Sequence, residues 1–252
     1  MKNICFVVVL YILFISFSLL GFVLALIFKL LDHLKFTHQA HKFNILAHYI
    51  IFKLPLRLMT IWKFEEKDGS YLEPLIIVVS NHFSLLDAPL IVSYFTKRNY
   101  RVIFIGRSGQ DKIPFIGWSM KLLGHIFIEF KPGNKAVGNS VRLSMEQLRT
   151  KMKSSERIAV VFFGTGLMQD QKDDPLKYEL KNGPFDLSKS LQISIVPVWL
   201  SGTDLAMPPS NPFWVSSATL LIRIGEEISP NASLDVMKLN CKIQLSRLKA
   251  QH

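Results

Sequence analysis

A histidine and an aspartate five positions apart are the residues of this chain with the clearest chemical potential. His82 and Asp87 lie in the stretch SNHFSLLDAPL, which directly follows the apolar run 75–79. Such a run predicts a buried strand, so the pair stands where a strand ends and a helix begins. A carboxylate beside an imidazole fixes its tautomer and stabilises the imidazolium that forms on proton uptake. The spacing therefore indicates a general base that acts on a hydroxyl group.

Two plainer interpretations compete with a general base. Ser84 lies in the same stretch and suggests a serine hydrolase, but the sequence has no G-x-S-x-G turn, on which such a nucleophile depends. A histidine that merely caps a helix is commoner than a catalytic one when the pattern occurs alone. The sequence around His82 is therefore needed to distinguish a general base from these two interpretations.

No pattern in the sequence indicates a resident metal or a disulfide framework. The two cysteines, Cys5 and Cys241, lie at opposite ends of the chain. Four histidines near the N-terminus have irregular spacings and no acidic cluster beside them: His33, His38, His41 and His48. We therefore expect no metal and no bound cofactor. His125 lies inside an apolar run, and we expect it to be a core histidine.

Apolar runs and helical patterns alternate from residue 71 onward and must position the His82 pair. Strands are predicted at residues 75–79, 102–105, 126–130, 158–163, 193–200 and 220–224. Helical spacing covers residues 137–152 and 187–191. A further helical stripe near the C-terminus consists of Leu234, Met237, Cys241, Leu245 and Leu248. This alternation predicts an α/β fold with a mixed sheet flanked by helices.

The N-terminal segment predicts a membrane anchor. Residues 4–28 carry no charge, and a helix of that length spans about 37 Å, more than the roughly 30 Å of a hydrocarbon core. The run is longer than the apolar region of a cleaved signal peptide and has no small-residue cleavage site after it. It therefore favours a retained helix, spanning the bilayer or embedded in it. The basic residues after it are Lys29, Lys35, Lys42, Lys53 and Arg57, against Lys2 before it. This asymmetry places the rest of the chain in the cytoplasm.

The composition agrees with a membrane surface as partner. The 252 residues are 49% hydrophobic and 19% charged, with a formal net charge of +11. A basic, apolar chain suits an anionic lipid surface better than nucleic acid, although basic excess alone does not choose between them.

The stretch 43–64 is interrupted by Lys53, Pro55, Arg57 and Lys63, so it is a poor spanning helix. It is equally consistent with an amphipathic helix in the membrane interface and with a helix packed against the domain.

The residues around His82 resemble the glycerolipid acyltransferase family, whose best-known members are the 1-acylglycerol-3-phosphate acyltransferases. That family is marked by N-H-x4-D, here Asn81, His82 and Asp87. Residues 107–130 are similar to its second block, and LKNGPFDLSKSLQISIVPVWLSG is similar to its K-x-G and V-P-V blocks. IRIGEEISP resembles its closing strand. The resemblance extends from about residue 75 to residue 230, and the first block is highly specific.

The resemblance implies a membrane-bound O-acyltransferase of phospholipid biosynthesis or remodelling. It would move a fatty acyl group from acyl-CoA or acyl-carrier protein to a lysophospholipid hydroxyl, foremost that of 1-acylglycerol-3-phosphate. His82 would deprotonate the hydroxyl and Asp87 would orient it, without a metal or an acyl-enzyme. The alternatives are another lysolipid headgroup, or a non-catalytic membrane-binding member. Residues 1–64 would form the anchor and residues 65–252 the catalytic domain, which faces the cytoplasm.

The family's third block, F-P-E-G-T-R, is altered in this chain. Residues 161–167 are VFFGTGL, so Phe162 and Phe163 stand at the Pro and Glu places and Gly166 at the Arg place. The second block usually ends in Arg, and here Phe130 is followed by Lys131. In the family the two arginines handle the glycerol-phosphate of the acceptor, so their absence here is what motivates the alternative of a lysolipid with another headgroup. The candidate substrate-binding residues are Asn81, Ser84, Arg107, Lys131, Gly164 and Thr165.

Overall fold

A mixed seven-stranded sheet forms the centre of the protein. The computed structural model describes residues 2–58, 62–67, 73–129, 141–146, 150, 156–169, 172–211 and 214–250. In these residues the strand order is β1-β7-β6-β2-β5-β3-β4. The strands are β1 (Trp62–Lys67), β2 (Leu75–Ser80), β3 (Tyr100–Arg107), β4 (Ile126–Ile128), β5 (Arg157–Phe163), β6 (Ile195–Ser201) and β7 (Ala218–Ile224). The predicted α/β fold with a mixed sheet is confirmed.

The central strands run parallel, so their carboxyl ends share one edge of the sheet. β6, β2, β5, β3 and β4 pair in parallel, β7 pairs antiparallel to β6, and β1 pairs parallel to β7. All six residues of β2 are buried, which agrees with its continuous apolar sequence. Ligands of open α/β sheets bind outside the carboxyl ends of parallel strands. This edge is therefore where a site is expected.

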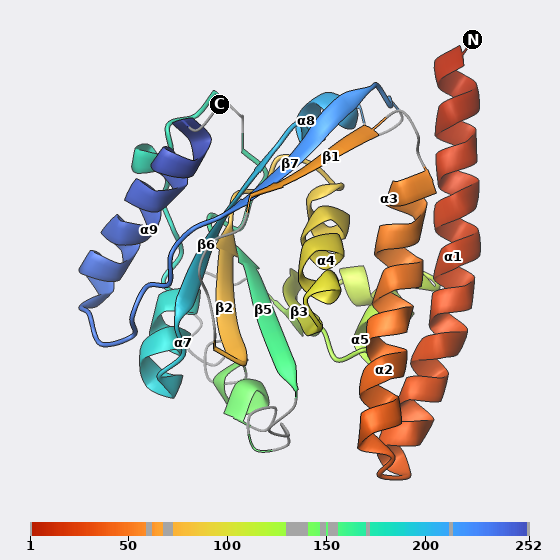
Figure 1. Cartoon of the computed structure of the whole chain (residues 1–252), viewed down its shortest axis with the longest axis horizontal. Coiled ribbons are helices and arrows are strands. Elements are labelled where there is room, and N and C mark those ends of the chain that lie inside the picture. Colours follow the sequence, from red (N-terminus) through yellow and green to blue (C-terminus); the bar gives the residue numbers. More distant parts are fainter. Residues whose placement is uncertain are drawn as a thin grey trace.

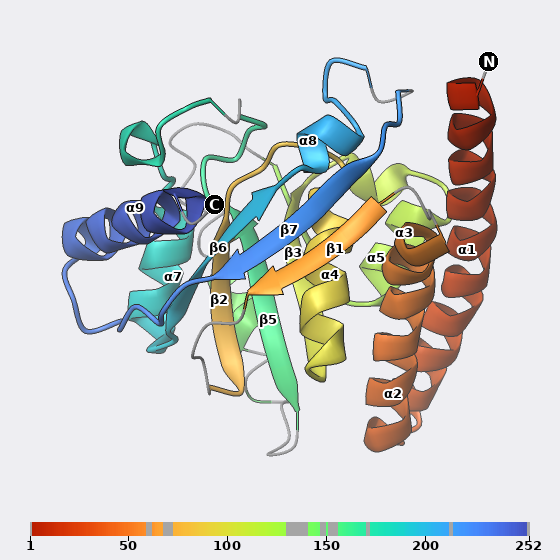
Figure 2. The ribbon, with the colours of Figure 1, turned by 45° about the horizontal axis from the view of Figure 1, so that its top comes forward.

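Helices cover the two faces of the sheet unequally (Figures 1 and 2). The helices are α1 (Lys2–His33), α2 (Thr37–His48), the π-helical turn η1 (Tyr49–Lys53), α3 (Leu54–Leu58), α4 (Asp87–Lys97), α5 (Ile116–Leu122), α7 (Gly183–Leu191), α8 (Thr203–Ala206) and α9 (Leu234–Ala250). The short 3₁₀ turns are η2 (Gln110–Lys112) and η3 (Pro175–Lys177). One apolar core joins the sheet to the N-terminal helices and α4, and a second core joins the other face to α7 and α9. The C-terminal stripe is confirmed, because Met237, Cys241, Leu245 and Leu248 are all buried in the second core.

The six predicted strands agree with the structure to within a few residues, but β1 was not predicted. Its sequence WKFEEK alternates buried and less buried positions at the edge of the sheet, next to β7 alone. Such a short, charged segment does not resemble a core strand. The expected boundary between residues 64 and 65 falls within β1. Of the helix predicted at 137–152, the structure describes residues 141–146, which are helical, and residue 150.

The N-terminal helices form a hairpin that packs against the domain. α1 and α2 run antiparallel after a turn in which Lys35 has a φ of 64° (Figure 1). Gly21 lies so close to η1 that an added Cβ would come within 2.0 Å of Ile51 Cγ1. Ile51, Phe52 and Leu56 are buried in the core. For the described part of the stretch 43–64, the structure thus shows the second alternative, packing against the domain.

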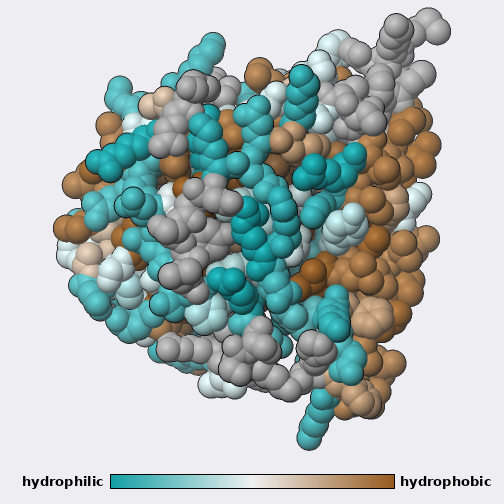
Figure 3. All heavy atoms as spheres, in the orientation of Figure 1, coloured by the Kyte–Doolittle hydropathy of each residue, from teal (hydrophilic) through white to brown (hydrophobic). Residues whose placement is uncertain are grey.

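The outer face of α1 is apolar and exposed. Its segment Tyr11–His33 is long and apolar enough to cross a membrane, by length and composition. The side chains on its outer face are about half exposed: Val8, Val9, Ile12, Ile15, Leu19, Leu20, Val23, Leu26 and Leu30. Figure 3 shows apolar side chains gathered over this side of the molecule, whereas the rest of the visible surface is mainly hydrophilic. An apolar face of this size marks an interaction surface.

Candidate functional site

One carboxylate organises the loop between β2 and α4. Asp87 is the first residue of α4, and its Oδ2 accepts hydrogen bonds from His82 Nδ1 at 2.8 Å, from Phe83 N at 2.6 Å and from Ser84 N at 2.8 Å. The Asp87 side chain is fully buried, whereas that of His82 is 18% exposed. A carboxylate is also favoured in the first turn of a helix, where backbone N–H groups point outward. The loop thus holds a buried acceptor behind a partly exposed imidazole.

The hydrogen bond to Asp87 fixes the tautomer of His82. A carboxylate only accepts hydrogen bonds, so Nδ1 of His82 carries the proton and Nε2 keeps its lone pair. The ring of Phe163 stacks on the imidazole with its centroid 3.9 Å away and an interplanar angle of 16°. Nε2 is therefore the ring nitrogen that can take a proton from a substrate. The predicted pair of His82 and Asp87 is together in space.

The backbone of His82 is held by two hydrogen bonds to Gln169, a residue that the sequence did not single out. His82 N donates to Gln169 Oε1 at 3.1 Å, and Gln169 N donates to His82 O at 2.7 Å. Gln169 lies in a polar segment after β5 without any motif, so the sequence offers no signal for this contact. Phe163 was singled out only because it stands at the place of a glutamate in the related family.

Asn81 and Ser84 use their side chains to hold the loop in place. Asn81 Nδ2 donates to Leu200 O at 2.9 Å, and Leu200 N donates to Asn81 Oδ1 at 2.8 Å, which ties the loop to β6. Ser84 Oγ donates to Met207 O at 2.7 Å. Both residues are buried. The structure thus gives each of them a role in the fold, and a contact with substrate stays a prediction.

Three of the other candidate residues lie along the carboxyl edge of the sheet: Gly164, Thr165 and Arg107. Gly164 follows β5 directly, and its N–H donates to Ser80 O at 2.8 Å. A side chain at Gly164 would meet Leu180 and Val79, so the close approach of the segments requires glycine. Thr165 comes next, and Arg107 is the exposed last residue of β3. Lys131 lies outside the described residues.

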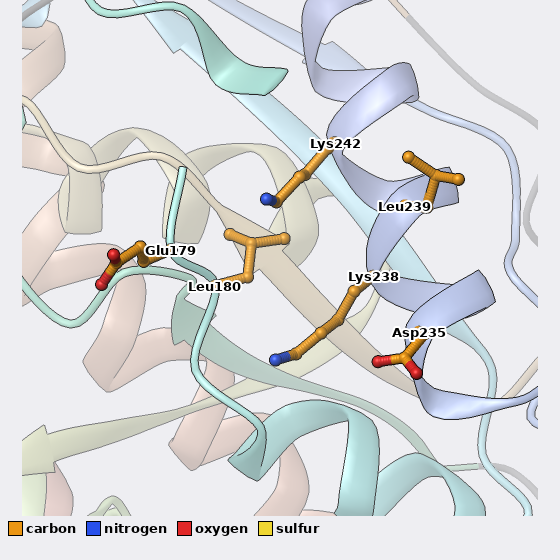
Figure 4. A pocket seen from close by; sticks show the side chains of 6 residues that line it. All are labelled: Glu179, Leu180, Asp235, Lys238, Leu239 and Lys242. Carbon is orange, nitrogen blue, oxygen red and sulfur yellow. The ribbon is translucent and has the colours of Figure 1, made fainter. Parts of the chain in front are cut away.

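Two further observations concern what a site could hold. In the described part of the chain, no group of three or more His, Cys, Asp or Glu side chains is arranged to hold a metal ion. A hollow of about 360 Å³ lies between α9 and the segment before α7, with Lys238 and Lys242 pointing from α9 toward Leu180 (Figure 4). None of the residues that line this hollow belongs to the His82 loop.

Comparison with known proteins gives a family model whose matched range includes the His82 loop. The family model described as Acyltransferase matches residues 62–201, which is more than half of the chain. This chain belongs to the acyltransferase family. The matched region of the chain begins at β1 and contains the His82 loop, β5 and β6.

Several curated proteins are related to this chain in sequence. A 1-acyl-sn-glycerol-3-phosphate acyltransferase of Chlamydomonas reinhardtii is 29% identical over 161 residues, which are 64% of this chain and 44% of that protein. A chloroplastic protein of the same description from Arabidopsis thaliana is 30% identical over 132 residues, 52% of this chain and 33% of that protein. The chain thus matches less than half of the length of these relatives.

A solved structure has the same fold. The 1-acyl-sn-glycerophosphate acyltransferase PlsC from Thermotoga maritima superposes with a TM-score of 0.75 at 18% identity. The superposition covers 100% of this chain and 98% of the PlsC chain, so the N-terminal helices are included.

Proposed function

We propose that this protein is a membrane-bound O-acyltransferase that moves a fatty acyl group from an acyl thioester to the hydroxyl of a lysophospholipid. The acceptor we propose first is 1-acylglycerol-3-phosphate, the substrate in the names of the curated relatives. The observation that carries the proposal is the 2.8 Å hydrogen bond between His82 Nδ1 and Asp87 Oδ2. It leaves Nε2 of a partly exposed imidazole free to act as a base.

The chemistry that follows needs one general base and no covalent enzyme intermediate. Nε2 of His82 takes the proton of the acceptor hydroxyl as its oxygen attacks the thioester carbonyl carbon. Asp87 stabilises the imidazolium that forms. The C–O bond forms, the C–S bond breaks, and the leaving thiolate takes the proton from Nε2. The products are an ester and a free thiol. A positioned base contributes about 10²–10⁴-fold to the rate, and holding both substrates together contributes further.

The altered third block bears on the acceptor. Phe163 and Gly166 stand where the related family has Glu and Arg. Arg107 and Lys131 are the proposed replacements for contact with a phosphate, and a lysine meets phosphate as a point charge rather than as a fork. A lysolipid with another headgroup is the alternative acceptor. The donor is acyl-CoA or acyl-carrier protein, and no cofactor is required.

The test is acyl transfer by membranes that carry wild type or His82→Ala. Labelled acyl-CoA is offered with lysophosphatidic acid and, in parallel, with neutral-headgroup lysolipids. We expect wild type to form diacyl product and His82→Ala to form none above background. Product from a neutral lysolipid alone would identify a different acceptor. A blank with both acyl-CoA and acyl-carrier protein would favour a non-catalytic membrane-binding protein and reject the proposal.

The packing of α1 supports a particular arrangement at the membrane. Gly21 and Phe22, near the middle of α1, contact Ile51, Phe115 and Trp118 of the domain. A helix that crossed the bilayer along its normal would carry these contacts to the middle of the hydrocarbon. The exposed, charged neighbours Arg57, Lys112 and Lys121 would go with them, at a cost of several kcal/mol. We therefore propose that α1 lies along one leaflet with its apolar face in the lipid, as interfacial helices do.

Topology distinguishes this arrangement from a spanning anchor. We expect an N-terminal tag and the catalytic domain to be reached by a protease from the same, cytoplasmic side of sealed vesicles. A spanning α1 would place the tag on the opposite side. The cytoplasmic side of the domain is the expectation from the sequence, and only the side of the tag differs between the two arrangements.

A further inference from the structure

Aromatic rings form a row across four neighbouring strands, beginning at His82 at the carboxyl edge of the sheet. Phe163 stacks on His82, and Phe104 stacks behind Phe163 with its ring centroid 6.2 Å away and an interplanar angle of 18°. His125 follows Phe104 at 5.5 Å and 26°. The row thus passes from the loop after β2 across β5 and β3 to the residue before β4.

The strand register explains the row. Ser80, two residues before His82, is the partner of Phe163 in the ladder between β2 and β5. Phe104 is the partner of Val161, so Phe104 and Phe163 are diagonal neighbours on one face of the sheet. Phe162 points to the opposite face and packs in the other core. The stacking partner of His82 is therefore specified by the sheet itself.

The hydrogen bond to Asp87 leaves the orientation of the imidazole incompletely defined. It constrains one atom, Nδ1, while the ring plane can still tilt about that contact. A parallel ring at stacking distance constrains the plane, and with it the direction of the Nε2 lone pair. The face of a phenyl ring also attracts a cation, so it favours the imidazolium that forms when His82 takes a proton.

Phe163 is itself held firmly from behind. Phe104 packs against it, and Phe104 N donates to His125 Nδ1 at 2.8 Å. His125 Nε2 lies 3.1 Å from His48 Nε2, and both imidazoles are buried. A stacking partner supported in this way presents a defined surface to the His82 ring, because the rings behind it restrict its movement.

We propose that Phe163 is the positioning residue that sets the ring plane of His82 for proton transfer. The inference rests on the proposed acyl transfer, in which His82 is the base. An apolar ring thus stands in this chain where the related family has a carboxylate. The orientation of the base is shared between Asp87, through Nδ1, and Phe163, through the ring face.

The experiment compares Phe163→Leu with Phe163→Tyr and with the matched control Phe162→Leu. The control makes the same substitution on the same strand, but on the face away from His82. For Phe163→Leu we expect kcat to fall about 10–100-fold, because small misplacements of a catalytic group have effects of this order. KM for both substrates is expected to stay within about 2-fold, since uniform binding is not altered. Phe163→Tyr keeps the aromatic ring, so we expect its kcat to lie much closer to that of wild type than to that of Phe163→Leu.

The outcomes separate this inference from the proposed function. His82→Ala is assayed in the same series, and each variant is also melted in detergent. Three results overturn the role of Phe163: kcat of Phe163→Leu equal to wild type, an equal fall in Phe162→Leu, or a rise in KM at constant kcat. If His82→Ala stays active, the proposed mechanism fails, whatever Phe163→Leu does. An inactive His82→Ala with a fully active Phe163→Leu leaves the function standing and removes only the stacking role.

Discussion

The imidazoles of His48 and His125 meet edge to face in the protein interior, with their Nε2 atoms 3.1 Å apart. His48 Nδ1 donates to Asn44 O at 2.8 Å, so its Nε2 is the acceptor of the pair. His125 Nδ1 accepts from Phe104 N, so its Nε2 is the donor. The pair therefore joins the N-terminal hairpin to β3 through two neutral rings whose tautomers are both fixed.

This pair predicts a loss of stability in mild acid. Burial lowers the pKa of His48 from 6.5 to about 4, and burial together with His48 lowers the pKa of His125 well below its ordinary value. Arg101 adds repulsion against a proton on either ring. Between these two pKa values of His48, the unfolded chain binds a proton that the folded chain does not. The free energy of unfolding therefore falls as the pH drops from 6.5 toward 4.

Urea unfolding in detergent at several pH values measures this dependence. We expect His48→Gln to be less stable than wild type at neutral pH and to lose less stability between pH 6.5 and pH 4. His33→Gln changes an exposed histidine at the end of α1 and serves as control. Equal pH slopes for wild type and His48→Gln would contradict a buried neutral pair.

Asp87 predicts a large loss of activity when its charge is removed. Asp87→Asn keeps an oxygen that can accept from Phe83 N and Ser84 N, but it no longer supplies the negative charge beside the imidazolium. We expect kcat to fall by about 10²-fold or more, because the tautomer and the charge of the base are both altered. Activity within 10-fold of wild type would mean that His82 works without its carboxylate. The assay is the acyl transfer described above.

Asn81 predicts a loss of stability rather than of binding alone. Asn81→Ala leaves the buried N–H and C=O of Leu200 without their partner. Each unpaired group costs about 1–3 kcal/mol, so the free energy of unfolding should fall by about 2–6 kcal/mol. Asn240→Ala, on the exposed face of α9, is the matched control. If the urea stability of Asn81→Ala were unchanged and its KM for the acceptor were higher, the structural role of Asn81 would be contradicted. The predicted contact between Asn81 and the substrate would then be supported instead.

The parts of the site that are close in sequence were predictable, and the parts that depend on register were not. His82 and Asp87 lie in one loop, and the apolar run before them identified β2. The partners of Asn81 and Phe163 come from other strands; Leu200 is 119 positions from Asn81. No periodicity in the chain encodes which residue of β5 stands beside which residue of β2.

The same reasoning explains the differences in the fold. β2 and β6 are buried on both faces, so an apolar run is enough to predict them. β1 owes its place to β7, which pairs with it residue by residue from Trp62 onward. Its charged residues are typical of an exposed edge and carry little strand signal of their own. Edge strands are set by the neighbour that they pair with.

Cys241 predicts a thiol that is protected until α9 leaves the sheet. It is fully buried in the second core, and burial raises its pKa to about 12. Both effects suppress the thiolate, which is the reactive form. In a Cys5→Ser background we expect a thiol reagent to modify the native protein very slowly and the urea-unfolded protein at once. Asn240→Cys, one position away on the exposed face, reports the rate of an accessible thiol. Equal rates at both positions would show that α9 is not packed as described.

Gly166 predicts that the arginine of the related family cannot simply be restored. Its φ is 75°, a left-handed conformation that glycine adopts without strain. Only Lys181 Cγ lies near an added Cβ, at 4.0 Å, so the obstacle is the backbone and not a lack of space. Gly166→Arg should therefore lower the free energy of unfolding by about 1–2 kcal/mol. Gly166→Ala should have the same effect without adding a charge.

Gly166→Asn tests whether backbone strain causes the loss of stability, because asparagine tolerates the left-handed region better than alanine or arginine. We expect its urea midpoint to lie between those of wild type and Gly166→Ala. If Gly166→Arg were as stable as wild type and faster with lysophosphatidic acid, the loop would rebuild itself around the new side chain. The departure at Gly166 would then be a missing side chain and not a different loop conformation. If stability falls as expected and activity does not rise, the altered third block is a different loop conformation rather than a missing side chain.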